Sequence, residues 1–433
     1  MGRMQMSSIP GVRAFGDRRF RLTAAMVVCA GATAHFLLVL LASFGNMPDL
    51  REVFIPSARA AYGGLLLYHP LPIGPPGHFT VGTSGAVDTP PFLLMMWPWT
   101  VVGDNPGQLA WEALQVLAVV VAVGLTYAGI GRPTSTELLV AVSLLMFLGP
   151  VRDSFQDGQV STILGALMAG ALLAHQKGKH LAGGVLLGIA GALKLTPLLT
   201  LPYFIWKRDL RLCAWATGTS VALFVVSIGS GRANGFAAFP GVISQLSAGT
   251  AAAQNQSLSG LILRFVLPGR TSFPIVPPPL DLRLLIVTGQ VVMLGLLVWL
   301  VGRVVVADPL RSWLQFSLVL LLVPTLQPFA WPHHWAWAVL VVPVCVHLAS
   351  RRLLHPAAAY GLLAAYLALT IFEFPLYTAA TAGATHPQLD PLLALGASLP
   401  LFTAVAVALL LALGTRPLTG GTPGAADVAP RAA

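Results

Sequence analysis

The chain has 433 residues, of which 56% are hydrophobic and only 9% are charged, and its formal net charge is +10. A soluble domain carries about 25% charged residues, so this composition excludes a soluble globular protein. The positive charge does not indicate a nucleic-acid partner, because the lysines and arginines are scattered among short loops and form no single basic face.

The first predicted element is a membrane-spanning helix at about 22–44. It follows residues 1–21, which carry five arginines. The apolar run is too long for a signal peptide, and no convincing cleavage site follows it. We therefore expect a retained first helix with a cytoplasmic N-terminal segment.

A segment rich in Pro and Gly, residues 45–106, follows the first helix. Within it, residues 91–102 are apolar but too short to cross a bilayer and are cut by Pro98, which predicts an interfacial or re-entrant helix. Further apolar stretches predict spans at 107–130, 137–150, 160–175, 181–206, 211–229, 284–306, 312–326, 334–350, 356–373 and 394–415.

The basic residues between these spans set the predicted topology. The cytoplasmic loops would carry Arg132, Lys177, Lys179, Lys207, Arg208, Arg211, Arg303, Arg311, Arg351, Arg352 and Arg416. This alternation requires 181–206 to be a hairpin of two short helices that breaks near Lys194 and Pro197. The prediction is an all-α polytopic membrane protein with about 12 passes, a transmembrane domain at 22–415 and a disordered cytoplasmic tail at 416–433.

Five segments then lie on the outer side, namely 45–106, 151–159, 230–283, 327–333 and 374–393. Asp49 lies in the first of them, where a positioned and partly shielded carboxylate could accept a proton from a hydroxyl. A solvated loop acid or a helix cap is the alternative for this residue. Asp88 precedes Pro90 and Pro91, which favours a role as the cap of the re-entrant helix.

Polar residues also gather in the outer segment 151–159, which contains Arg152, Asp153, Gln156, Asp157 and Gln159. Such a cluster offers donors and acceptors for a sugar, although ordinary solvated loop charges explain it equally well. In the large outer segment 230–283, Asn255, Gln256 and Arg264 form another candidate polar wall.

Lys194 stands within an otherwise apolar run, where an ammonium either snorkels to the interface or meets an anion such as a lipid phosphate. His333 and His334 form a pair at the outer end of a predicted span. No Cys, His or acidic residue stands at metal-ligand spacing from them, so we expect hydrogen bonds to phosphate or sugar and no metal. The three cysteines are far apart and are expected to be packing residues.

Four short motifs follow one another along the chain: Gly158-Gln159-Val160, Ala192-Leu193-Lys194-Leu195-Thr196-Pro197, Asn255-Gln256-Ser257-Leu258-Ser259-Gly260 and Trp331-Pro332-His333-His334-Trp335. Together with Asp49-Leu50 in the first outer segment, they resemble the polyprenol-phosphate-mannose-dependent α-mannosyltransferases of actinobacteria, which belong to glycosyltransferase family 87. The resemblance implies the GT-C fold, a polytopic catalytic domain with its active-site loops on the outer face of a bacterial plasma membrane.

The resemblance further implies transfer of mannose from a polyprenyl-phosphate-mannose donor to a glycolipid acceptor of the phosphatidylinositol mannoside or lipomannan type. Asp49 would be the general base. The donor phosphate would be bound by Lys194, His333, His334 and Arg264, and the substrates by Gln159, Asn255, Gln256 and Asp88. No cofactor is implied, because the departing phosphate is a good leaving group.

Two other functions compete with this one. An arabinofuranosyltransferase that uses polyprenyl-phospho-arabinose would share the first-loop Asp, but the His-His-Trp element favours mannose. A lipid-sugar transporter would need ionisable residues deep at the membrane midplane, whereas the candidate residues here cluster at one outer face. The sequence indicates no oligomeric state.

Overall fold

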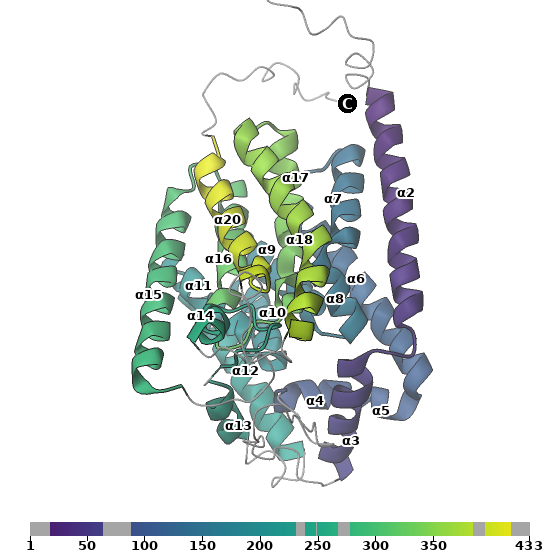
Figure 1. The fold of residues 1–433 in the computed structure, drawn as a ribbon, viewed down its shortest axis with the longest axis vertical. Helices are drawn as coiled ribbons and strands as arrows, with labels where there is room; N and C mark the ends of the chain where they lie inside the picture. Colours follow the sequence, from purple (N-terminus) through teal and green to yellow (C-terminus); the bar gives the residue numbers. More distant parts are fainter. Residues whose placement is uncertain are drawn as a thin grey trace, which may run out of the picture.

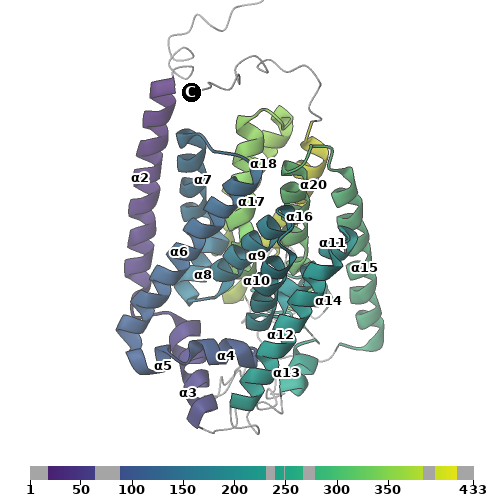
Figure 2. The ribbon, with the colours of Figure 1, turned by 180° about the vertical axis from the view of Figure 1, so that it is seen from behind.

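A computed structural model describes residues 18–63, 88–230, 239–247, 249–266, 278–383 and 395–416. Its regular structure is helical (Figures 1 and 2), which confirms the predicted all-α class. The long helices in chain order are α2 (Arg18–Ser43), α6 (Asp104–Ile130), α7 (Ser135–Phe147), α9 (Ser161–Gln176), α10 (His180–Leu193), α12 (Leu210–Ser230), α15 (Leu280–Arg303), α16 (Leu310–Leu322), α17 (Ala338–Ser350), α18 (Pro356–Gly383) and α20 (Leu399–Gly414).

Shorter helices fill the segments between them. They are the π-helix η2 (Asp49–Phe54), α3 (Ile55–Gly63), α4 (Pro90–Met96), α5 (Trp99–Val102), α8 (Gly149–Asp157), α11 (Leu201–Trp206), α13 (Phe239–Leu246) and α14 (Leu258–Val266), with 3-10 turns η3 (Thr196–Thr200), η5 (Pro324–Leu326) and η6 (Pro332–Trp337). The break between α4 and α5 at Pro98 confirms that residues 91–102 do not form one continuous helix.

Membrane-spanning capacity is clear for part of this set. Within the described residues, five helical segments are long and apolar enough to cross a bilayer, and the bent pair α7–α8 would make a sixth. Five further apolar helices are shorter, between 10 and 17 residues. The chain is therefore a multi-pass membrane protein, whereas the count of about 12 passes stays a prediction.

Residues 151–159, predicted to be an outer loop, do not form a loop. Most of this segment belongs to α8, which bends by 57° from α7. Leu148 is extended between the two helices, and Pro150 occupies the first turn of α8, where a proline needs no amide donor. The prediction failed because nine mostly polar residues, with only Val151 and Phe155 apolar, are too short a stretch for a helical apolar stripe to be recognised.

The predicted hairpin is present. Asp209, which follows α11, contacts His180 at the start of α10 through Oδ1 at 2.7 Å and His175 at the end of α9 through Oδ2 at 2.6 Å. The two ends of the segment 180–209 therefore meet, and the chain reverses near Lys194, which is extended at φ −150°. The break allows Lys194 to leave the apolar helix at the turn of the hairpin.

Several of the basic segments predicted to be cytoplasmic contact one another. Arg351 donates to the carbonyl of Arg132, Gln176 donates to the carbonyl of Pro309, and the Arg416 amide donates to the carbonyl of Leu353. Figure 1 places the start of α2 and the end of α20 at one end of the molecule, and α3, α4 and α5 at the other. The start of the first described helix and the end of the last one thus lie at the same end of the molecule, opposite to these short helices.

Candidate active site

Asp49 opens the π-helix η2, immediately after Pro48. Single π-turns are frequent at functional sites. The side chains of Leu50 and Phe54 anchor the turn in the core, and Phe54 packs edge-on against Phe92 of α4 at 4.8 Å between ring centroids. These contacts leave Asp49 half-buried at the surface of a rigid element.

The carboxylate of Asp49 is held by a residue more than 100 positions away. Nε2 of Gln159 donates a hydrogen bond to its Oδ2. Among the described residues, Oδ1 of Asp49 takes no hydrogen bond, so one oxygen remains available to a hydroxyl. Asp49 and Gln159, which the sequence offered as separate candidates, are therefore in direct contact.

Gly158 sets the position of this contact. It ends α8 in the left-handed conformation at φ +75°, and its carbonyl accepts a 2.7 Å hydrogen bond from the indole of Trp111. A Cβ at this position would lie 2.6 Å from Cβ of Leu50 and 3.3 Å from Sδ of Met47. Only glycine therefore permits both the turn and the close packing beneath Asp49.

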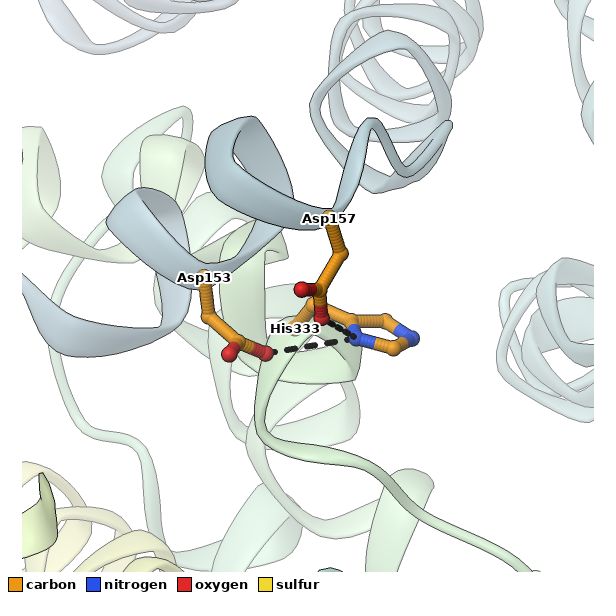
Figure 3. A group of neighbouring side chains, drawn as sticks. All are labelled: Asp153, Asp157 and His333. Carbon is orange, nitrogen blue, oxygen red and sulfur yellow. Dashed lines mark ion pairs between the residues drawn. The ribbon is translucent and has the colours of Figure 1, made fainter. Parts of the chain in front are cut away.

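Two carboxylates of α8 face a histidine from η6 (Figure 3). Asp153 and Asp157 are four residues apart and so project from one face of the helix. Nδ1 of His333 lies 3.3 Å from Oδ2 of Asp153 and 3.8 Å from Oδ2 of Asp157. The imidazole is 4% exposed, whereas each aspartate side chain is about one third exposed.

Asp88 and Lys194 are two further charged residues of the candidate site. Burial raises the pKa of Asp88 to about 7, while the charge of Lys194 opposes this rise and that of Asp49 adds to it. Burial likewise lowers the pKa of Lys194 to about 8, against the attraction of Asp88 and Asp49. Among the described residues, the Lys194 ammonium has no hydrogen bond or close ion pair. It is available to an anionic group.

Thr89, not Asp88, caps the re-entrant helix, which corrects the expected capping role of Asp88. Oγ1 of Thr89 accepts a hydrogen bond from the amide of Phe92. It also lies 2.5 Å from the carbonyl of Ala192 and 3.0 Å from that of Leu193. Because Pro90 follows directly, Thr89 is forced into the extended conformation that an N-cap requires. The cap also ties α4 to the end of α10, beside Lys194.

Lys194 and Asp49 both lie close enough to His333 to act on its charge. The residues around Asp49 and Lys194 and those around His333 therefore form one cluster. We call the group Asp49, Asp88, Asp153, Asp157, Gln159, Lys194 and His333 the polar cluster. His334 lies next to it, with its ring centroid 4.9 Å from that of His333. Neither ring nitrogen of His334 has a hydrogen-bond partner among the described residues, although the side chain is buried.

Asn255, Gln256 and Arg264 are placed differently. Asn255 bonds to the backbone of Thr250, Pro328 and Ala330, and Gln256 bonds to that of Ala253 and Ala397. Arg264 donates to the carbonyls of Ala252 and Asn255 and to Oγ of Ser398. These contacts fasten residues 250–257 to the segment that leads into His333.

Two members of the polar cluster, Asp153 and Asp157, were recognised in the sequence only within a polar segment that offers donors and acceptors for a sugar, and neither was given a role of its own. Their spacing of four residues was the available signal, but it has meaning only on a helix, and this segment was taken for a loop. Gly158 was noted only as part of the Gly158-Gln159-Val160 motif, and Trp111 gave no signal, because the packing role of both residues arises from the fold.

A largely apolar cavity of about 690 Å³ lies between α7, α17, α18 and α20. Leu148 and Pro150 line one part of it, one turn before Asp153, and Thr134 and Arg351 line another. Its volume falls within the roughly 300–1,000 Å³ of small-molecule sites. Its lining suits a hydrocarbon chain.

A family model described as glycosyltransferase family 87 matches residues 87–328, more than half of the chain. The chain belongs to glycosyltransferase family 87. The matched range contains Asp88, the aspartates of α8, Gln159, Lys194 and Asn255.

Relatives whose names state their reaction are similar in sequence to most of this chain. A "polyprenol-phosphate-mannose-dependent alpha-(1-2)-phosphatidylinositol mannoside mannosyltransferase" of Mycolicibacterium smegmatis is 26% identical over 288 residues, which cover 64% of the chain and 57% of that relative. A "phosphatidylinositol pentamannoside mannosyltransferase" with the same donor dependence and linkage in its name, from the same organism, is 26% identical over 383 residues, 87% of each chain. Among solved structures, ArnT from Cupriavidus metallidurans bound to undecaprenyl phosphate matches 89% of this chain and 77% of its own at 14% identity, with a TM-score of 0.43.

Proposed function

We propose that this family 87 member transfers mannose from polyprenyl-phosphate-mannose to a hydroxyl of a glycolipid acceptor of the phosphatidylinositol mannoside or lipomannan type. The observation that carries the proposal is the Asp49 carboxylate, which Gln159 anchors and which acts electrostatically on Lys194, whose ammonium has no hydrogen bond or close ion pair among the described residues. The donor and acceptor named for the relatives support the choice of substrates.

The reaction that suits this geometry is a single displacement. The acceptor oxygen forms a bond to the anomeric carbon of mannose while the bond from that carbon to the phosphate oxygen breaks, which inverts the configuration. Oδ1 of Asp49 takes the hydroxyl proton as general base, and Gln159 fixes the carboxylate through Oδ2. The polyprenyl phosphate departs with the electron pair.

Lys194 is the candidate partner for the departing phosphate. Its pKa of about 8 lies above neutral pH, so it keeps its proton under physiological conditions. An ammonium held in a partly buried site stabilises a developing anion more strongly than one in water. The buried, unpaired His334 is a second candidate donor to the same phosphate.

The other candidate residues support positioning more than direct contact. Asn255, Gln256 and Arg264 spend their polar groups on the backbone and on Ser398, and thereby hold the segment that carries His333. Their binding to the donor phosphate or the substrates remains a proposal. Asp88 and Lys194 act on each other's charge, so we assign Asp88 the role of orienting the ammonium.

We propose an active site on the outer face of a bacterial plasma membrane, within a domain of the GT-C type. The support is the basic segments around Arg132, Arg351 and Arg416, which the positive-inside rule assigns to the cytoplasm. The apolar cavity one turn from Asp153 supports a lipid substrate that reaches the polar cluster from within the bilayer.

The test is transfer by purified wild type and Asp49→Asn, reconstituted with polyprenyl-phosphate-mannose and a phosphatidylinositol mannoside. We expect at least a 100-fold loss in the variant, since general base catalysis contributes about 10²–10⁴-fold. Asp104→Asn is the matched control, because Asp104 is exposed and pairs with Arg59. Equal transfer by Asp49→Asn and wild type would contradict the assignment of the base.

A second arm separates the competing functions. Wild type that transfers arabinose from polyprenyl-phospho-arabinose but no mannose is an arabinofuranosyltransferase. Movement of lipid-linked sugar across proteoliposomes without transfer would identify a transporter.

A further inference from the structure

His333 is the starting point, because it is a buried imidazole without an ordinary hydrogen bond. Neither of its ring nitrogens has a hydrogen-bond partner of acceptable geometry among the described residues, and the side chain is 4% exposed. Buried polar groups in proteins are almost always hydrogen-bonded, so such a group indicates a ligand or another role. Its Nδ1 points at the two carboxylates of α8 (Figure 3).

The three side chains are arranged as ligands of one ion. One ligand atom from each of Asp153, Asp157 and His333 lies within 4.8 Å of the other two. Atoms bound at about 2.1 Å to an octahedral ion are about 3.0 Å apart in adjacent positions and about 4.2 Å apart in opposite ones. The distances of 3.3 and 3.8 Å from Nδ1 to the carboxylates fall in this interval.

Electrostatics also calls for a cation at this place. Asp153 and Asp157 lie close to each other and to Asp49, so three carboxylates share one region. On the proposed function, a negatively charged lipid phosphate must enter the same region, where it would meet these carboxylates as well as Lys194. A bound cation removes that repulsion, and it also compensates the carboxylates themselves.

We propose that Asp153, Asp157 and His333 form a divalent cation site. The ligands would be one carboxylate oxygen of each aspartate and Nδ1 of the histidine, with the remaining positions open to water and to a phosphate oxygen. Two carboxylates and one imidazole are a hard, mixed ligand set, which suits Mn²⁺. This proposal revises the expectation of no metal: the acidic ligands missing near His333 along the sequence come from α8, about 180 residues earlier.

The proposed cation acts on the donor phosphate, and in that respect the proposal rests on the proposed function. A cation there supplies positive charge for the departing phosphate. Lys194, on the turn of the hairpin, supplies charge from a different element. The site itself does not depend on the sugar or the acceptor, so it can be measured without substrate.

The experiment is a Mn²⁺ titration of the full chain in lipid nanodiscs, treated with a chelator and then freed of it. Free Mn²⁺ is followed by its electron paramagnetic resonance signal. We expect one Mn²⁺ per wild-type chain and at least about tenfold weaker binding in Asp153→Asn and Asp157→Asn, since even second-shell changes cost about 10–100-fold. Asp281→Asn is the control, an exposed aspartate in the first turn of α15.

Each variant is first checked for an unchanged thermal unfolding midpoint in the absence of Mn²⁺. A folded wild type that binds no Mn²⁺, or a folded Asp157→Asn that binds it as tightly as wild type, overturns the site. Wild type that transfers mannose through Asp49 but binds no Mn²⁺ overturns the cation site and leaves the proposed function standing. Mn²⁺ binding that depends on both aspartates, without sugar transfer from either donor, overturns the proposed function and leaves the cation site standing.

Discussion

Gly158→Ala tests whether packing behind Asp49 positions the proposed base. The new methyl group would lie 2.6 Å from Cβ of Leu50, whereas ordinary contacts begin at 3.4 Å, so the two groups must separate by about 0.8 Å (3.4 minus 2.6). Leu50 is buried and directly follows Asp49, so the shift passes to the carboxylate. A misplacement of about 1 Å in a reacting group costs about 100-fold in rate.

The substitution also carries a cost in stability, which a second glycine isolates. A left-handed residue with a side chain costs roughly 1–2 kcal/mol, and overpacking adds typically 1–3 kcal/mol. Gly178, in the turn between α9 and α10, is left-handed at φ +66° but has open space around its Cβ position. Gly178→Ala therefore incurs only the backbone cost.

The assay compares mannose transfer and thermal unfolding for both variants. We expect about 100-fold slower transfer for Gly158→Ala and wild-type transfer for Gly178→Ala, at a temperature where both remain folded. If folded Gly158→Ala transfers within twofold of Gly178→Ala, Leu50 does not couple the turn after α8 to Asp49, and the reasoning is refuted.

Two further predictions concern the hairpin. Because the pKa of Lys194 is about 8, the rate of transfer by wild type should fall about tenfold as the pH rises from 7 to 9. The rate of Lys194→Arg at pH 9 should stay close to its rate at pH 7, because arginine keeps its charge. Identical pH–rate profiles for the two proteins would show that Lys194 does not bind the phosphate. Burial acts to raise the pKa of Asp209, but hydrogen bonds from His175, His180 and the Leu212 amide outweigh it and lower the pKa. Its stabilisation is thus present above the ordinary carboxyl pKa of about 3.9 and lost as the pH falls through the lower folded value. Asp209→Asn should cost about 2–3 kcal/mol at pH 7, seen as a lower unfolding midpoint, with Asp281→Asn unchanged.

The sequence predicted the parts of the fold that depend on local apolar patterns. The first helix, the helix 107–130 and the hairpin around Lys194 were all found close to their predicted places, because a lipid-facing helix must be apolar over most of its length. Charge counting alone required the hairpin, and the contact between Asp209 and His180 confirms its geometry.

The candidate site could be predicted only in part, since its contacts join distant segments. Lys194 was identified from its place in an apolar run and Gln159 from a polar segment, and the resemblance added to both, but the contact of Gln159 with Asp49 and the proximity of Lys194 to His333 arise from the fold. The aspartates of α8 were missed as a pair because a nine-residue helix after a sharp bend carries no readable period.

Five residues of the polar cluster stand where a proline or a glycine interrupts a helix, whereas Asp153 and Asp157 lie within α8. Asp49 follows Pro48, Asp88 precedes the Pro90-Pro91 start of α4, and His333 follows Pro332. Lys194 leaves α10 three residues before Pro197, and Gln159 follows the left-handed Gly158.

A proline cannot donate to the preceding turn and disfavours the helical conformation of the residue before it, so the extended Thr89 and Trp331 before Pro90 and Pro332 are fixed by covalent structure. Within a membrane protein such breaks are tolerated where the freed backbone finds partners inside the protein, as the carbonyls of Ala192 and Leu193 do with Thr89. The same breaks therefore gather polar side chains of five distant segments, around residues 49, 88, 159, 194 and 333, into one cluster, which is where we propose that lipid-linked substrates bind.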